Sequence, residues 1–446
     1  MAKPRLRAGA IFERLRESLW FVPGLMVLGA GAVAAALAPR SGAAPDLPLI
    51  HFLLPSTVDG ARAVLQVVAA SVVTVTSVVF SLTVVALQIT AGNYSPRVLR
   101  TFLRDMGTQF VLGTFLATFT FSFIVLQNTR PLSVKGEPSW APEWGFIPIP
   151  LFVAGTIFAL VFFIHHVTQA IRVDLILREV LDDTMRTIDR IHPVDESSRE
   201  ESFDPAAVPP EALTIRAPSS GFLQTVGPEE LLDVLHDLQL KACLAPSVGD
   251  HVLEGTTLAW VWGDDVTDDR RVEQAIRDAV QLGDERTMQQ DVAFGVRQLV
   301  DIAVRALSPG VNDPNTAVTA IAHLEVAYGR LASRSLGVLE FRDPDGVARV
   351  FVPRPTFGEY LHITIQQIGH YGSADVMVLL RLIVMLANLK LVAIESHQEP
   401  IDKAIDRVVS EAESELRLED DRSAVRESAK RAVERPSVVG HRTAAG

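Results

Sequence analysis

The chain has 446 residues, of which 48% are hydrophobic, and its formal net charge is −12. The mean hydropathy of +0.25 is high for a soluble protein, so the composition indicates a membrane protein with a sizeable soluble part. Basic residues outnumber acidic ones up to Arg130 and acidic residues dominate after it, which argues against a nucleic-acid-binding surface. The single cysteine, Cys243, excludes an internal disulfide framework and fits a reducing compartment.

Four membrane spans are predicted in the first part of the chain. The first is the uncharged run at residues 18–39, which is longer than the apolar core of a signal peptide and is therefore expected to stay in the membrane. The second, at residues 63–96, is the longest uncharged stretch, and the third and fourth lie at residues 106–129 and 145–171. Runs of this length suit helices, because a helix satisfies its own backbone donors and acceptors in hydrocarbon.

The second predicted span carries a polar stripe. At about 100° per residue, Thr74, Ser77, Ser81 and Gln88 fall on one side of the helix, and bulky apolar side chains lie mostly outside that sector. Two interpretations stay open. The stripe could pack helices, since Ser and Thr allow close approach and can bond to their own backbone, or several copies of the helix could line a polar pathway.

The basic residues predict the orientation of these spans. The N-terminal segment, the loop after the second span and the segment after the fourth span hold most of the nearby Lys and Arg, which places them in the cytoplasm. Both termini are then cytoplasmic, and Trp20, Trp140 and Trp144 are expected at the membrane interfaces. His165 and His166 fall near the end of the fourth span, where they could reach headgroups or water or belong to a proton pathway.

Two blocks of sequence resemble a known family. These are VVALQITAGNYSPRVLRTFLRDMGTQFVLGTF at residues 84–115 and RALSPGVNDPNTA at residues 305–317. Both are similar to a bacterial family of predicted four-span membrane proteins catalogued as a domain of unknown function. The resemblance covers nearly the whole chain except the tail, and it implies a topology but no activity and no catalytic residue.

A short basic helix is predicted within the first block. Ser95 can cap it and Pro96 suits its first position. The spacing of Arg97, Arg100 and Arg104 then puts the three side chains on one face of the helix. This face could bind anionic lipid headgroups, at about 1 kcal/mol per basic residue near the surface. Alternatively, the three arginines only orient the chain.

After the fourth span, an apolar stripe predicts that the helix continues into the cytoplasm until Pro193, so that residues 1–193 form a four-helix transmembrane domain with a cytoplasmic extension. Residues 194–211 read as a linker. Residues 212–263 are predicted to form a small β-rich module with strands at 213–217, 222–226, 240–244 and 258–262. The pattern resembles a half-barrel of the biotinyl-lipoyl type, but it lacks the carrier lysine, so no swinging cofactor is expected.

A mainly helical cytoplasmic domain is predicted at residues 264–416. Its helices are expected at residues 285–307, 357–370, 373–391 and 400–416, with a hairpin at residues 338–352 around an Asp-Pro-Asp-Gly turn. Residues 417–446 are charged and lack an apolar period, so they are predicted to be a disordered tail that folding does not need.

One loop of this domain is a candidate ligand site. Asn312, Asp313, Asn315 and Thr316 surround the start of a predicted helix, where backbone donors and side chains could hold an anion or small ligand, or could merely cap the helix. The sequence has no glycine-rich phosphate loop, no cluster of metal ligands and no nucleophile elbow. We therefore expect no cofactor, no metal and no catalytic residues.

The predicted fold is a multi-span α-helical membrane protein with four transmembrane helices and a C-terminal α+β cytoplasmic region that contains a small β half-barrel and a helical part. The expected partners are the lipid bilayer of the plasma membrane and further copies of the chain. Two functions fit these features. One is an oligomeric channel-like or pore-forming protein with a cytoplasmic assembly domain, and the other is a non-transporting scaffold or sensor that couples this domain to the membrane.

Overall fold

The computed structural model describes residues 20–37, 57–93, 105–129, 142–170, 172–193, 203–204, 207–263 and 269–434. The chain folds as two compact units, Met1–Leu175 and Ile176–Gly446, which we call unit 1 and unit 2. Unit 1 contains the long apolar helices, and unit 2 contains the strands and the remaining helices.

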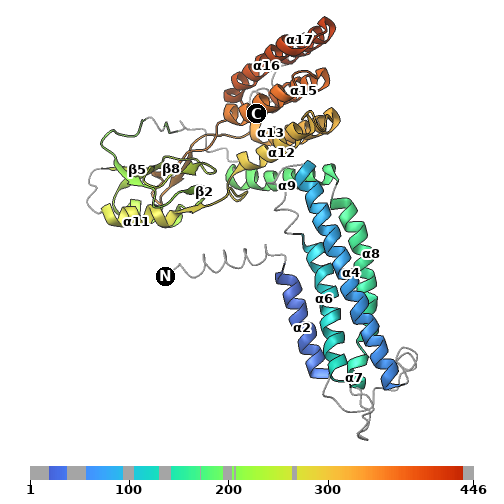
Figure 1. The fold of residues 1–446 in the computed structure, drawn as a ribbon. Helices are drawn as coiled ribbons and strands as arrows, with labels where there is room; N and C mark the ends of the chain where they lie inside the picture. The colour runs from blue at the N-terminus through green and yellow to red at the C-terminus, as the bar shows by residue number, and fades with distance from the viewer. Residues whose placement is uncertain are drawn as a thin grey trace, which may run out of the picture. The chain divides into compact units, whose positions relative to one another are not determined.

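Unit 1 is a bundle of helices. Its elements are α2 (Phe21–Leu37), α4 (Val58–Asn93), α6 (Met106–Gln127), the short α7 (Glu143–Phe146) and α8 (Ile149–Ala170), and the four longer ones run alongside one another (Figure 1). Three stretches are long and apolar enough to cross a membrane, Val58–Gln88, Met106–Gln127 and Trp144–Gln169, whereas α2 is an apolar helix of 17 residues. The second, third and fourth predicted spans are thus confirmed as long apolar helices.

Helix α6 lies at the centre of this bundle, because it packs against α2, α4 and α8. Gly113 lets α2 come close, since a Cβ at this position would lie 2.5 Å from the sulfur of Met26. Phe115 is fully buried in an apolar cluster with residues of α4 and α8. A buried hydrogen bond of 3.0 Å joins the hydroxyls of Thr118 and Thr156, and so links α6 to α8.

The predicted continuation of the fourth span into the cytoplasm is wrong in one respect. Helix α8 ends at Ala170, and a separate helix, α9 (Val173–Ile191), begins after it. The first turn after the break is held by a backbone bond from Leu175 to the carbonyl of Arg172. Because α9 is amphipathic, one side of it packs within unit 2, where Leu177 and Ile188 are fully buried.

Unit 2 contains two small sheets where the sequence predicted one half-barrel. The strand order is β1-β5-β3-β8-β7 in the larger sheet and β4-β2-β6 in the smaller one. The strands are β1 (Leu213–Arg216), β2 (Gly221–Val226), β3 (Leu240–Leu244), β4 (His251–Val252), β5 (Thr257–Gly263), β6 (Val280–Gly283), β7 (Leu339–Arg342) and β8 (Ala348–Val352), with α10 (Glu229–Asp237) and α11 (Asp269–Ala279) packed beside them. The four strands and the hairpin predicted from the sequence are confirmed.

Strands from outside the predicted β-rich module complete both sheets. β8 pairs in parallel with β3, with Ala242 opposite Val350 and Cys243 opposite Phe351, and β6 pairs with β2. Parallel pairing brings together segments about a hundred residues apart in the chain, so no local turn signal could have predicted it.

The rest of unit 2 is a set of packed helices (Figure 1). These are α12 (Val292–Ala306), α13 (Pro314–Ala332), α14 (Phe357–Tyr371), α15 (Val376–Val392), α16 (Glu395–Glu415) and α17 (Glu419–Val433). α12 begins later than predicted because residues 284–291 form a loop, which we call the junction loop, and Asp291 at its end caps the helix. Buried Tyr328 of α13 donates a hydrogen bond of 2.6 Å to the carbonyl of Tyr360 and so ties α13 to α14.

The prediction of a disordered tail from residue 417 is wrong for residues 419–433. These residues form α17, which buries Val425, Ala429 and Ala432 and packs against α15. The ammonium group of Lys390 also donates to the carbonyl of Val433 at 3.3 Å. Three buried side chains at helical spacing are a weak signal among so many charges, and the sequence analysis missed it.

We therefore expect α17 to stabilise unit 2. Val425→Asp should lower the free energy of unfolding by about 3 kcal/mol, because it buries a carboxylate in the contact with α15. Ser423→Asp, on the exposed side of the same helix, is the matched control and should change it by less than about 0.5 kcal/mol. Thermal unfolding of the full-length protein in detergent measures both, and equal melting temperatures for Val425→Asp and the wild type would contradict the contribution of α17.

Candidate functional site

The polar stripe predicted on the second span lies on an exposed side of α4. Thr74, Ser77, Ser81 and Gln88 are all exposed. The three hydroxyls donate to carbonyls one turn earlier in the same helix, at 3.0, 3.0 and 2.9 Å. The stripe therefore packs against no other part of the described chain, and its hydroxyl donors are satisfied without water or a neighbouring helix.

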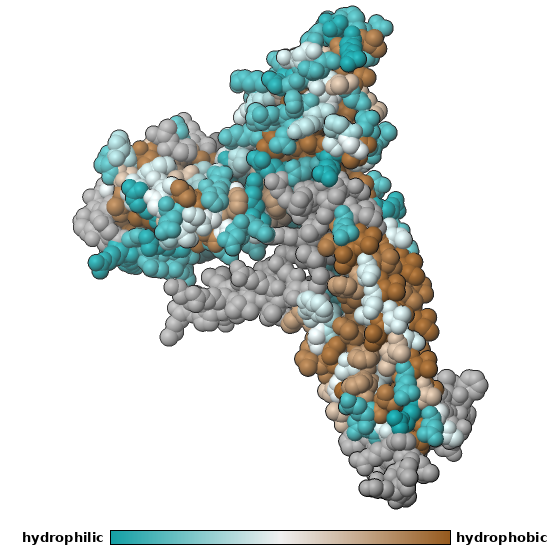
Figure 2. Space-filling view, in the orientation of Figure 1, coloured by the Kyte–Doolittle hydropathy of each residue, from teal (hydrophilic) through white to brown (hydrophobic). Residues whose placement is uncertain are grey.

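The same side of α4 carries small and polar side chains along most of its length. Its exposed members follow one another at the three-, four- and seven-residue steps that keep side chains on one face. We call this set the α4 outer face: Ala63, Gln66, Ala70, Thr74, Ser77, Ser81 and Gln88. In Figure 2, pale side chains run along the brown surface of the helices of unit 1 over α4.

The α4 outer face lies opposite the side of the helix that packs inside the bundle. The buried residues of α4 are Ala61, Leu65, Ala69, Val72, Val79 and Ala86. At about 100° per residue, they lie roughly half a turn away from the outer face. Large apolar side chains are exposed as well: Val67, Val78 and Val85 lie at the edge of the outer face, and Val64 and Leu82 lie further round the helix. Helix α4 thus has one packed side, apolar flanks and one uncovered side of small and polar residues.

Of the two predicted interfacial histidines, His166 is paired within unit 1. Its Nε2 lies 2.6 Å from a carboxylate oxygen of Asp105, and its ring stacks on Phe162. Asp105 also caps α6 by accepting from the backbone N–H of Gly107 and Thr108. This acid–base pair ties the start of α6 to the end of α8, and the sequence analysis missed it because the partners are 61 residues apart.

The predicted basic face has no structural outcome here, since Arg97, Arg100 and Arg104 lie outside the described residues, as does Trp140. His165 is exposed. Its contact with headgroups or water stays a prediction.

The candidate ligand loop is built as a helix cap. Asp313 accepts from the backbone N–H of Thr316 at 3.1 Å and from its hydroxyl at 2.6 Å, and these hydrogen bonds lower the pKa of Asp313. Asn312 has a left-handed backbone (φ +50°), which turns the chain into α13, and Asn315 is exposed on the first turn. The structure brings the four residues together, but the Asp313 carboxylate already occupies the helix start. Ligand binding there stays a prediction.

The junction loop connects the sheets of unit 2 to its helices. The side chain of Gln290 exchanges two hydrogen bonds with the backbone of Val226 in β2, at 3.1 and 3.0 Å. Arg354, which follows β8, donates to the carbonyl of Gln290 at 2.8 Å. Asp291 accepts two hydrogen bonds from Arg286 and caps α12. These contacts are buried or half-buried, so the loop fixes the sheets of unit 2 to its helices.

Helix α9 is fastened to the same region. Thr187 donates to the carbonyl of Met288 in the junction loop at 2.8 Å. Buried Arg334, which follows α13, donates to the carbonyl groups of Ile188 and His192 at the end of α9 and forms an ion pair with Asp189. Burial, together with the positive charges of Arg354 and Arg334, lowers the pKa of His192 to about 4. His192 is therefore neutral at physiological pH.

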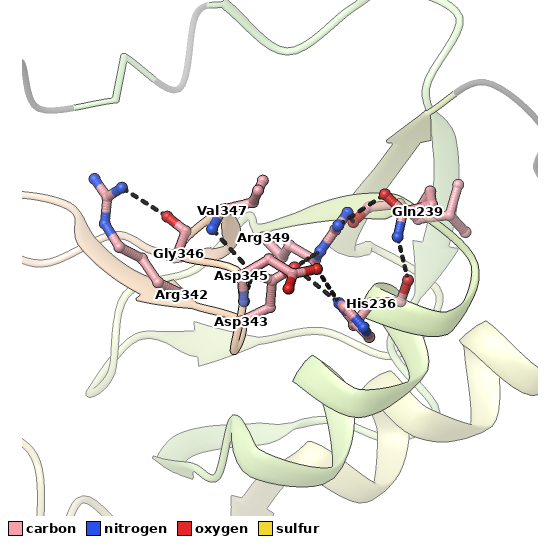
Figure 3. A network of polar contacts seen from close by, with 9 residues as sticks. His236, Gln239, Arg342, Asp343, Asp345, Gly346, Val347 and Arg349 are labelled. Atoms are coloured by element: carbon pink, nitrogen blue, oxygen red, sulfur yellow. Dashed lines mark hydrogen bonds and ion pairs between the residues drawn. The ribbon is translucent and has the colours of Figure 1, made fainter.

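A network of polar contacts in the β-rich part surrounds Asp343, at the turn of the β7–β8 hairpin (Figure 3). Asp343 is buried and accepts from Nδ1 of His236 at 3.0 Å, from the guanidinium of Arg349, and from the backbone N–H of Asp345 and Val347 at 3.0 and 2.9 Å. The turn was predicted from its sequence, but the partner histidine, 107 residues earlier, was not.

This cluster contains the ligand types of a metal site, but its charges favour an ion-pair cluster. His236, Asp343 and Asp345 bring their ligand atoms within 4.8 Å of one another. However, the guanidinium of Arg349 lies against Asp343, where it would repel a cation, and the oxygens of Asp343 are already engaged by four donors. Burial alone would raise the pKa of Asp343, but the hydrogen bonds from His236 and Arg349 outweigh it and hold this pKa below its usual range.

The hydrogen bond to Asp343 raises the pKa of His236 above its usual value. The pKa of His236 is thus higher in the folded state than in the unfolded chain, where it is about 6.5. The stabilisation from this pair is fully present below about pH 6.5 and is lost as the pH rises through the folded pKa. Between pH 6.5 and the folded pKa, the stability of the wild type should therefore fall as the pH rises, and the stability of His236→Gln should fall less. Denaturant midpoints measured across this range would reveal the difference. His362→Gln at an exposed position is the control, and an unchanged pH slope in His236→Gln would contradict the assignment.

The chain resembles proteins of unassigned activity over most of its length. The family model described as "Predicted membrane protein (DUF2254)" matches residues 16–388. Uncharacterized proteins of Mycobacterium bovis and Mycobacterium tuberculosis are each 36% identical over 456 residues, which cover 97% of this chain and 84% of theirs. No solved structure matches the chain. The resemblance noted in the sequence is confirmed, and the chain belongs to the DUF2254 family of predicted membrane proteins.

Proposed function

We propose that this membrane protein assembles as a homo-oligomer in which the α4 outer faces of the copies face one another around a channel-like pathway. The observation that carries the proposal is the exposure of this face on the side of α4 opposite its packed side. A helix surrounded by lipid gains nothing from small and polar side chains, whereas a helix that meets another copy or water does.

The composition of the face supports contact between copies. Ala63, Ala70, Ser77 and Ser81 are small, so two helices can approach closely along them. The Ser and Thr hydroxyls of the face donate to carbonyls of their own helix. These donors therefore stay satisfied when the face meets another helix. Close packing of this kind suits a helix that already has its other side buried in its own bundle.

The same composition supports a wet lining. A hydroxyl that donates to its own backbone still offers its oxygen lone pairs, so the face can accept hydrogen bonds from water. Gln66 and Gln88 add amide groups towards the two ends of the face. The face carries no charged side chain, so the pathway would be lined by neutral polar groups.

The proposed topology has four spans with both ends in the cytoplasm of a bacterial cell. Helix α2 has 17 residues, which at ~1.5 Å per residue gives about 26 Å, close to the thickness of the hydrocarbon core. With α4, α6 and α8, it makes an even number of crossings. The basic residues near the membrane support a cytoplasmic location for the side that contains unit 2.

Two substitutions separate a wet pathway from a packed contact. If the face lines a pathway, Ser81→Leu should reduce ion flux through the reconstituted protein while the amount of oligomer stays the same, because the added bulk projects into the lumen. Thr74→Val, which nearly keeps the shape but removes the hydroxyl, should also reduce flux. Val64→Leu, at an exposed position about a third of a turn from the centre of the face, is the matched control and should behave as wild type.

The same experiment can favour the scaffold alternative. If the face only packs helices, Ser81→Leu overfills a close contact at a cost of about 1 to 3 kcal/mol and reduces the oligomer first. Wild-type protein that passes no ions under voltage or tension, with variants that change only the amount of oligomer, would rule out the pathway.

The topology is tested by labelling. A cysteine introduced at Leu253, an exposed position in unit 2, should react with a membrane-impermeant maleimide only after the cells are permeabilised. The native Cys243 is buried, and burial raises the pKa of its thiol to about 11, so it gives little background. Labelling of Leu253→Cys in intact cells would contradict the cytoplasmic location of unit 2.

A further inference from the structure

The larger sheet of unit 2 has two faces of different character. Its inner face packs against α10 and α11 through residues such as Ala242, Val261 and Val350, which belong to one buried apolar cluster. Side chains alternate along a strand, so the residues next to these in β3, β5 and β8 point to the opposite side of the sheet. We call this side the outer sheet face: Lys241, Cys243, Trp260, Trp262, Glu340 and Phe351.

An aromatic ring from outside the sheet lies on the outer sheet face. Phe203 belongs to the linker between α9 and β1, and its ring centroid lies 3.9 Å from that of Phe351 and 5.8 Å from that of Trp262. The centroids of Trp262 and Phe351 are 5.9 Å apart, and all three rings are stacked. Since β3 lies between β5 and β8 in the sheet, Phe203 bridges two strands that do not pair with each other.

The backbone of the linker is held at the same place. The N–H of Phe203 donates to Oε1 of Glu340 in β7 at 3.3 Å, and the other oxygen of this carboxylate accepts from Arg342 at 3.1 Å. The ring and the backbone of one residue therefore fasten this part of the linker to the sheet. We call the place that receives Phe203 the aromatic slot: Trp262, Glu340 and Phe351.

The charge beside the aromatic slot is complementary to the linker. Phe203 lies in the run EESFD at residues 200–204, which contains three acidic residues and no basic one. Lys241 is directly opposite Trp262 in the pairing of β3 with β5, so the two side chains lie on the same side of the sheet. A cation beside the slot favours an acidic segment over a basic one.

Cys243 also lies on the outer sheet face. It is opposite Trp260 in β5 and opposite Phe351 in β8. Its thiol is nevertheless fully buried, although it lies outside the inner apolar cluster. The aromatic side chains that flank it include Phe351, on which Phe203 stacks. The reactivity of this thiol therefore reports on the state of the outer sheet face.

We propose that the aromatic slot is a docking site for an acidic segment that carries an aromatic ring, and that the chain's own linker occupies it as a detachable strap. Phe203 is half-buried, and its contact is one stacked ring and one hydrogen bond to a carboxylate. Such a contact opens locally without disturbing the buried apolar cluster on the other face of the sheet. The docked strap covers the aromatic surface, and the open strap exposes this surface and gives access to Cys243.

The strap is tested through Cys243, the single cysteine, in the full-length protein in detergent. Phe203→Ala should raise the rate at which a maleimide modifies Cys243 by about tenfold or more, because the strap no longer docks. Phe203→Tyr, which keeps the ring, and Glu211→Ala, at an exposed position of the same linker, should react as slowly as the wild type. Equal rates for Phe203→Ala and the wild type would overturn the proposal.

A synthetic peptide of residues 198–208 separates a docking site from a loosened sheet. Added in excess to Phe203→Ala, it should slow the modification of Cys243 towards the wild-type rate, because it fills the empty slot. The same peptide with Phe203→Ala should have no effect. In the wild type, the attached strap has an effective concentration on the order of 1 mM, so the peptide should not bind well below that concentration.

The docking site is also overturned if the peptide leaves the fast modification of Phe203→Ala unchanged, since the substitution would then only loosen the sheet. Neither measurement depends on ion flux or on the number of copies in the assembly. Their outcome is therefore independent of whether the α4 outer face lines a pathway.

Discussion

The arrangement of unit 1 depends on the rule that a polar group in hydrocarbon must find its partner inside the protein. In α4 the hydroxyls find these partners in their own helix, because they donate to carbonyls one turn earlier, as Ser77 does to Val73. The second feature is the position of α4 in the bundle. Helix α6 takes one side of α4 and leaves the opposite side, with its small and polar residues, uncovered. The proposed assembly follows from this division of one helix into a packed side and an uncovered side.

Unit 2 depends on a different kind of contact, a set of buried polar groups that join segments far apart in sequence. The junction loop meets β2 through Gln290, the β8–α14 connection through Arg354, and α9 through Thr187. Arg334 then fixes the end of α9. Removing one partner of such a network leaves the others buried without hydrogen bonds, so these residues hold the sheets, α9 and the helices in one arrangement. Unit 2 is thus one connected body.

The sequence prediction succeeded where the residues that form a feature are close together in the chain. Apolar length identified α4, α6 and α8, and the hydroxyl stripe at Thr74 was found because its residues share one helix. The prediction failed where the partner is distant in sequence. His166 meets Asp105, His236 meets Asp343, and β3 pairs in parallel with β8, and each of these contacts joins separate segments without a turn signal. The helix break after Ala170 was missed as well, since the apolar period runs through it.

The central claim is that copies of the chain meet through the α4 outer face, and a cysteine scan along residues 63–88 in native membranes tests it most directly. Cross-linking between copies should peak at Ala63, Ala70, Ser77 and Ser81 and fall at Val64 and Leu82, which are exposed about a third of a turn away. That pattern repeats with the period of a helix and identifies the side that faces another copy. A flat profile, or maxima at Val64 and Leu82, would contradict the account.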